Sequence, residues 1–266
     1  MTGRSDCNFG AVAASAVKDL QEELDVLLSP KSWLAGLSTA LLLMPLSVAA
    51  QSFQQQGEPP QLVELFTSEG CSSCPPADQR LSTLLEHPQL WRRFVPLAFH
   101  VDYWDYLGWQ DPFADSRFST RQRDKRARGE LRSVYTPAFV IDGQEWRGFF
   151  RGQDWPLPPR RDGGRLTAEL DGDQLRVSFV NDQAPAELKA QVALLGFGLG
   201  SDVSRGENRG RRLEHQFVVQ SLQQQSGQRD WQFHLPKVAG EQLALAVWIT
   251  AGDAGQPLQV LGGWID

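Results

Sequence analysis

Two short and almost wholly apolar runs in the first half of the chain, residues 62–66 and 94–101, have the pattern of buried strands. Between them, residues 71–86 carry apolar side chains at helical spacing. Pro75 fits only the first turn of such a helix, where a missing N–H costs little. The order strand, helix, strand predicts a right-handed parallel βαβ unit, with its helix beginning at or just after Cys71.

A second helix and a hairpin are predicted next. Residues 115–128 have the pattern of a helix, and Gly129 is a typical stop signal. Residues 138–141 and 145–149 are strand-like runs on either side of Asp142-Gly143. Because Asp-Gly is typical of tight hairpin turns, we expect these two strands to pair.

The pattern changes after residue 151. Residues 152–165 are rich in Pro, Gly and Arg, which is typical of a linker. Short alternating runs follow, without a long helix, at 166–170, 175–180, 188–195, 213–220, 231–235, 242–250 and 258–264. We therefore predict an α/β domain over residues 61–151, followed by an antiparallel, β-sandwich-like domain over residues 166–266.

The first fifty residues have features of a targeting segment. Lys31 precedes an apolar run at residues 33–48, and small residues follow it up to Ala50. The run is too short and too interrupted for a comfortable membrane span, although an uncleaved anchor is the alternative. We interpret residues 1–50 as a spurious leader plus a signal peptide, and residues 51–60 as a flexible N-terminus. This interpretation predicts a periplasmic or secreted protein.

Composition and charge narrow the class of function. With 41% hydrophobic and 22% charged residues, the chain is neither wholly disordered nor collagen-like. A net charge of −6 argues against a nucleic-acid binder. The three cysteines, Cys7, Cys71 and Cys74, are too few for a disulfide framework, and Cys7 falls in the leader.

The sequence Cys71-Ser-Ser-Cys74 at a strand-to-helix junction predicts redox chemistry. A helix N-terminus stabilises a thiolate, so we expect Cys71 to be the nucleophile of low pKa. Cys74, about one helical turn further on, is then placed to resolve a mixed disulfide. Half of a zinc site and a passive disulfide are the alternatives, although zinc needs about four ligands.

Thr136-Pro137 stands at the start of the predicted hairpin. The order strand, helix, strand, helix, proline, hairpin resembles that of thioredoxin-like proteins. That resemblance implies a cis bond between Thr136 and Pro137, facing the cysteine pair. It also implies that Thr136 offers backbone groups to a bound peptide.

Four segments together resemble the DUF1223 family, a bacterial family of unassigned function. They are residues 66–75, 100–109, 134–137 and 205–211, in the family's order. The resemblance runs from about Leu62 to the C-terminus and implies a thioredoxin-like fold, often behind a signal peptide. Where a thioredoxin-like domain usually closes with a helix, this chain has a short Pro-containing segment after Arg151. The resemblance implies no reaction.

Two further polar residues are candidates for proton transfer. His100 ends the second predicted strand, near the sheet edge where ligands collect in α/β folds. It is a candidate proton shuttle for Cys71 or a third ligand for a soft metal. Glu64 lies inside an apolar strand, so burial could raise its pKa and let it accept a proton from Cys74.

Other polar and aromatic groups favour structural roles. We expect the acids of the 102–113 loop, Asp102, Asp105 and Asp111, to cap turns. The aromatic side chains of this loop are expected to pack in the core or to line a groove for a polypeptide. The basic side chains at residues 117–132 suit a solvated helix face or a docking site for an acidic partner. In the 205–211 segment we assign no mechanism, beyond Glu207 or Asn208 fixing a loop through hydrogen bonds.

These observations favour an exported thiol–disulfide oxidoreductase that has no bound cofactor. Its expected partners are protein thiols or disulfides, with membrane contact only through an uncleaved signal segment. One alternative is a copper-binding or metallochaperone-like protein using Cys71, Cys74 and His100. Another is an adaptor whose sandwich binds a partner and whose cysteines are structural.

Overall fold

The computed structural model describes residues 50–157 and 161–266. The predicted leader and signal peptide, with Cys7, lie outside these residues, apart from Ala50. Within the described ranges, no helix is both long and apolar enough to cross a membrane.

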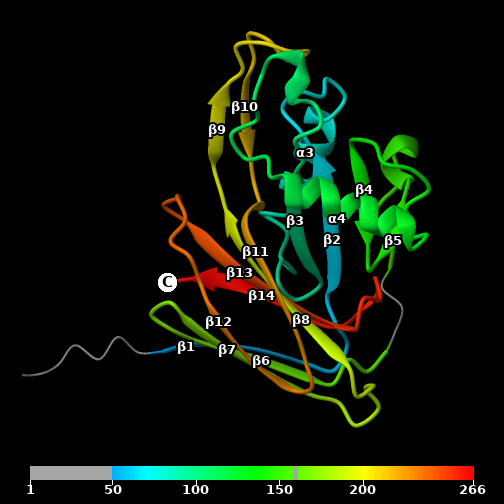
Figure 1. Ribbon diagram of the computed structural model, residues 1–266, viewed down its shortest axis with the longest axis vertical. Coiled ribbons are helices and arrows are strands. Elements are labelled where there is room, and N and C mark those ends of the chain that lie inside the picture. Colours follow the sequence, from blue (N-terminus) through cyan, green and yellow to red (C-terminus); the bar gives the residue numbers. More distant parts are fainter. Residues whose placement is uncertain (1–49, 158–160) are drawn as a thin grey trace, which may run out of the picture. The chain divides into compact units, whose positions relative to one another are not determined.

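The largest element is a mixed sheet of eight strands in the order β14-β13-β8-β11-β3-β2-β4-β5 (Figure 1). Its strands are β2 (Gln61–Thr67), β3 (Phe94–His100), β4 (Ala138–Ile141), β5 (Gln144–Trp146), β8 (Leu188–Gly196), β11 (Val218–Gly227), β13 (Leu243–Ala251) and β14 (Pro257–Ile265). As predicted, β2 and β3 are parallel and β4 and β5 form a hairpin. Asp142 and Gly143 make its turn, with φ of 50° and 79°.

The predicted fold class, a thioredoxin-like α/β domain followed by a separate sandwich-like domain, is wrong. The described chain is mostly β, with two α-helices, α3 (Pro75–Ser82) and α4 (Ser116–Ala127). Strands from both halves belong to one sheet, because β11 lies beside β3 and Phe217 O accepts a hydrogen bond from Ala98 N at 2.8 Å. The apolar pattern predicts where strands lie along the chain, but it does not predict which distant strand pairs with an open edge of the sheet.

A second, antiparallel sheet has four strands in the order β1-β6-β7-β12. They are β1 (Gln51–Gln56), β6 (Arg165–Asp171), β7 (Gln174–Val180) and β12 (Asp230–His234). The prediction of a flexible segment is therefore wrong at residues 51–56. Strand β1 pairs along its whole length with β6 and buries Phe53 against the core.

Two apolar clusters fill the fold. One lies between the four-stranded sheet and a face of the eight-stranded sheet, and includes Phe179 of β7 and Val247 of β13. The other joins β2, β3 and β4 to both helices and includes Leu81 of α3 and Phe118 of α4. Burial of these side chains is the main favourable term in folding.

Two features of the fold position the candidate site. The helix was predicted to begin at or just after Cys71; α3 begins at Pro75 with Cys74 as its N-cap, so Cys71 lies in the turn before the helix and not at its first residue. A hairpin of β9 (Leu199–Asp202) and β10 (Arg212–His215) rises beside α3 (Figure 1). Short 3-10 helices occur at Asp105–Leu107 (η2) and Gly148–Arg151 (η3).

Candidate functional site

Residues 70–74, here called the cysteine turn, connect β2 to α3 and carry both cysteines. Neither Cys71 nor Cys74 forms a disulfide, and their exposed fractions are 1% and 0%. Cys71 Sγ lies 3.3 Å from Ser73 Oγ and 3.8 Å from Thr136 O. The turn therefore presents one sulfur toward the start of β4.

The Thr136–Pro137 peptide bond is cis, as predicted. Thr136 O faces Cys71 Sγ, while Thr136 Oγ1 accepts a hydrogen bond from Trp104 Nε1 at 2.8 Å. Trp104 also packs closely on Gly70, where an added Cβ would lie 2.8 Å from Trp104 Cβ. The segment before Pro137 and the 102–113 loop thus both border the cysteine turn.

The two thiols have opposite acidities. The pKa of Cys71 is lowered from 9.0 to about 6, mainly by the hydrogen bond from Cys74 and against the opposing effect of burial; hydrogen bonds with Ser73 and with the Thr136 side chain contribute to the same shift. Burial raises the pKa of Cys74 well above its ordinary value, and the neighbouring Cys71 adds to this effect. Near neutral pH, Cys71 is therefore a thiolate and Cys74 a thiol.

Asp78 is a buried acid four residues after Cys74, so the two lie on the same side of α3. Burial raises the pKa of Asp78 to about 7, although His215 and a hydrogen bond from Thr67 Oγ1 at 3.0 Å act in the opposite direction. The negative charge of Asp78 in turn helps to raise the pKa of Cys74. Asp78 is not among the residues predicted from the sequence, although its spacing of four residues from Cys74 indicates that both lie on one side of the helix.

Glu64, a predicted proton acceptor, is held by helix α4 instead. Its Oε1 lies 2.7 Å from Arg121 and its Oε2 lies 2.8 Å from Lys125. Burial alone would raise the pKa of Glu64, but these two cations lower it. Arg121 and Lys125 also correct the prediction of a wholly solvated basic helix face, because Lys125 is only 2% exposed.

His100 is buried and bonded to a carboxylate, with Nδ1 at 2.7 Å from Asp111 Oδ2. Within residues 50–157 and 161–266, no three His, Cys, Asp or Glu side chains are grouped so that they could hold a metal ion. The alternative copper set of Cys71, Cys74 and His100 is therefore not assembled there.

The 102–113 loop is tied to the core by polar contacts. Asp111 Oδ2 accepts a hydrogen bond from Glu69 N at 2.9 Å, and Asp105 Oδ1 accepts one from Asp111 N at 3.3 Å. Trp109 Nε1 donates to the buried carboxylate of Glu69 at 2.8 Å, and His215 Nε2 lies 3.0 Å from that carboxylate. These contacts fit the predicted capping role of the loop acids.

Residues 203–211, here called the β9–β10 loop, reach the cysteine turn from the second half of the chain. Asn208 Nδ2 donates to Cys71 O at 3.0 Å and to Glu69 O at 2.8 Å. Glu207 Oε2 accepts from Ser72 N at 2.9 Å and from Ser72 Oγ at 2.7 Å. Sequence reasoning gave this loop no link to the cysteines, because nothing local signals a contact across 135 residues.

A family model described as "Protein of unknown function (DUF1223)" matches residues 62–250 of the chain. The chain belongs to the DUF1223 family. The resemblance that the four sequence segments indicate is thereby confirmed, and the match includes the cysteine turn, Pro137 and the β9–β10 loop.

Solved structures support the architecture of this DUF1223 member. A crystal structure of a protein from Agrobacterium tumefaciens is similar with a TM-score of 0.53 and 25% identity, over 79% of this chain and 96% of that one. HBP35 of Porphyromonas gingivalis is similar in fold, with a TM-score of 0.51, 13% identity, and coverage of 79% of this chain and 76% of that one. No curated protein matches the chain.

Proposed function

We propose that this protein is an exported thiol–disulfide oxidoreductase that exchanges disulfides with protein partners through Cys71 and Cys74. The observation that carries the proposal is the geometry of the cysteine turn, in which both cysteines are free and Cys71 Sγ lies 3.8 Å from Thr136 O at the start of β4. The opposite shifts of the two thiol pKa values support it. Cys71, with a pKa of about 6, is ionised near neutral pH, whereas Cys74 keeps its proton. Thiolates, not thiols, attack disulfides, so this pair has a defined order of reaction.

In the first step, the Cys71 thiolate attacks one sulfur of a partner's disulfide. A Cys71–partner disulfide forms, the partner's S–S bond breaks, and the released partner thiolate takes a proton from water. In the second step, Cys74 loses its proton and attacks Cys71 Sγ. The Cys71–partner disulfide breaks, the released partner thiolate takes a proton from water, and the partner leaves as a dithiol, reduced by two electrons, while Cys71 and Cys74 are left as a disulfide.

Asp78 is suited to accept the proton of Cys74 in the second step. A general base works best when its pKa is near the working pH, and that of Asp78 is raised to about 7. This role replaces the one predicted for Glu64, whose carboxylate is neutralised by α4.

The remaining parts of the proposal concern recognition and location. Thr136 O, 3.8 Å from Cys71 Sγ, is a main-chain acceptor beside the reacting sulfur and is suited to a partner's backbone N–H. Export rests on the apolar run at residues 33–48 and the small residues that follow it.

A Cys74→Ser variant tests the proposal, because it forms the mixed disulfide but cannot resolve it. We expect the reduced variant to accumulate a covalent adduct with insulin, which carries disulfides, and to release it on treatment with dithiothreitol. The doubly substituted Cys71→Ser, Cys74→Ser protein is the matched control and should form none. Absence of the adduct from the Cys74→Ser variant would contradict the proposal.

A further inference from the structure

We propose that Glu207 is a positioning residue that holds the cysteine turn closed over Cys71, so that release of its contact with Ser72 makes the sulfur accessible. This inference rests on the proposed exchange function. It assigns a role to the β9–β10 loop, residues 203–211, within that site.

The cysteine turn must move before Cys71 can react with a protein. Cys71 is 1% exposed and Cys74 is fully buried, whereas Ser72 and Ser73 between them are exposed. A partner's disulfide has to reach Cys71 Sγ directly in order to exchange with it. Access therefore depends on whatever keeps the turn in its closed position.

Two side chains of the β9–β10 loop hold the turn, and they differ in burial. Asn208 is 1% exposed, donates to Cys71 O and Glu69 O, and accepts a hydrogen bond at its Oδ1 from Arg211 Nη1 at 2.9 Å. Loss of this buried contact would leave polar groups unpaired, which is costly. Asn208 is therefore the permanent anchor of the turn.

The contact made by Glu207 has the properties of a releasable one. Both Glu207 and Ser72 are exposed, so water can replace each hydrogen bond when the contact breaks. The backbone N–H and the hydroxyl of Ser72 lower the pKa of Glu207, which keeps it a charged acceptor. Charge-assisted bonds of this kind are stronger than neutral ones, yet at a surface they open readily.

The rest of the loop is seated independently of Glu207. Gly206 lies against the 102–113 loop, where an added Cβ would be 3.6 Å from Trp109 Cβ and 3.9 Å from Leu107 Cβ. Arg205 lies against Gly108 of the same loop, 3.6 Å from an added Cβ there. Release of Ser72 can thus free the cysteine turn while the β9–β10 loop stays in place.

Alkylation of Cys71 by iodoacetamide tests the inference without any protein partner. In reduced protein, the rate constant rises with pH to a plateau; the midpoint reports the pKa of Cys71 and the plateau reports access to its ionised sulfur. We expect Glu207→Ala to raise the plateau about fivefold, the effect of losing roughly one net hydrogen bond. Glu207→Gln retains an acceptor oxygen and should stay within about twofold of the unsubstituted protein.

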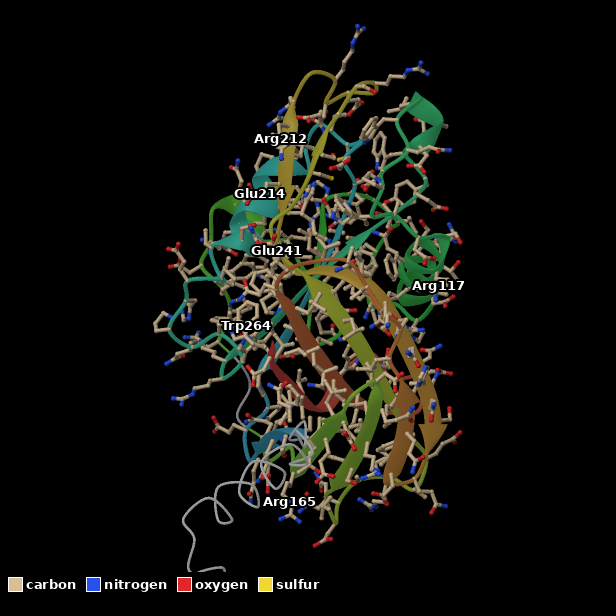
Figure 2. All side chains as sticks on the ribbon, turned by 90° about the vertical axis from the view of Figure 1, so that its left-hand side faces the viewer. Arg117, Arg165, Arg212, Glu214, Glu241 and Trp264 are labelled. Atoms are coloured by element: carbon tan, nitrogen blue, oxygen red, sulfur yellow. The ribbon has the colours of Figure 1, made fainter. Side chains whose placement is uncertain are left out.

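Glu214→Ala is the matched control. Glu214 lies on β10 in the same hairpin (Figure 2), and its carboxylate accepts a hydrogen bond from Gln216 Nε2 rather than from the cysteine turn. Its alkylation profile should be unchanged. An unaltered plateau in Glu207→Ala would overturn the inference, as would a shifted midpoint with the same plateau in both Glu207 variants, which indicates an effect of charge alone.

This test separates the inference from the proposed function. If the unsubstituted protein forms no mixed disulfide while Glu207→Ala still raises the alkylation plateau, the exchange function fails and the closing role of Glu207 stands. If mixed disulfides form and the plateau does not change, the closing role fails alone.

Discussion

Replacement of Cys71 by serine is expected to lower the rate of insulin reduction, with dithiothreitol as electron donor, by about a thousandfold or more, to the uncatalysed background. A serine hydroxyl does not ionise near neutral pH, and it cannot form a disulfide. Cys74 cannot substitute for Cys71, because burial raises the pKa of Cys74 well above its ordinary value and the sulfur keeps its proton near neutral pH.

Glu214→Ala and Cys74→Ser are useful comparisons for this loss. Glu214→Ala changes an exposed residue outside the cysteine turn while both sulfurs remain, and it should retain exchange. Cys74→Ser should react once, in a burst, and then stop at the mixed disulfide. If the Cys71→Ser protein reduced insulin at the rate of the unsubstituted protein, Cys71 would not be the reacting residue.

Replacement of Asp78 by asparagine is expected to stabilise the reduced protein at alkaline pH, by roughly 4 kcal/mol of unfolding free energy. The pKa of Asp78 is about 7 in the folded protein against an ordinary 3.8, so the folded state holds the proton more tightly than the unfolded state. The stability due to Asp78 is therefore fully present below pH 3.8 and is lost as pH rises through about 7.

Asparagine has no such titration and can still accept the hydrogen bond from Thr67. The stability difference between Asp78→Asn and the unsubstituted protein should thus be large above pH 7 and small near pH 4, as measured by urea unfolding at both. A difference independent of pH would mean that Asp78 is not a buried acid of raised pKa. The same variant should also resolve the mixed disulfide more slowly, because Cys74 loses its proton acceptor.

The strands were largely predictable, because local patterning determines them. The second-half runs, such as the one predicted at 188–195 and found at Leu188–Gly196, alternate apolar and polar residues or are wholly apolar, and the Asp142-Gly143 turn has a strong local signal. Strand β1 was missed because glutamines dominate it and Phe53 is its one large apolar residue.

The sheet order was not predictable from the same signals. The edge of β3 is covered by β11, whose residue Val218 is 120 positions after its partner Ala98. Several predicted strands have a similar hydrophobic pattern, and that pattern does not indicate which of them pairs with the edge of β3. The prediction of two separate domains failed at this contact.

The residues of the candidate site also differ in whether the local sequence predicts them. Cys71, Cys74 and Thr136-Pro137 were predicted because the residue types and their order among the predicted elements can be recognised from the local sequence. Glu64 was misassigned, although every residue of β2 is buried and a charged side chain there needs a partner. The basic residues of helix α4 supply that partner, and the helical spacing of Arg121 and Lys125 could have indicated it.

The contacts of Glu207 and Asn208 with the cysteine turn could not be predicted from the sequence. Their segment carries no catalytic motif, and the side chains act on the cysteine turn only because the β9–β10 hairpin is packed beside α3. Knowledge of the sheet order is needed before this contact can be expected.

The proposed order of reaction depends on one physical property, the ionisation of Cys71 below neutral pH. The most direct test is an ultraviolet titration of thiolate absorbance in the reduced protein, with Cys71→Ser as the baseline. We predict a midpoint at a pH of about 6 that is absent from the Cys71→Ser protein. A midpoint near the ordinary value of 9.0 would contradict the proposed order of reaction.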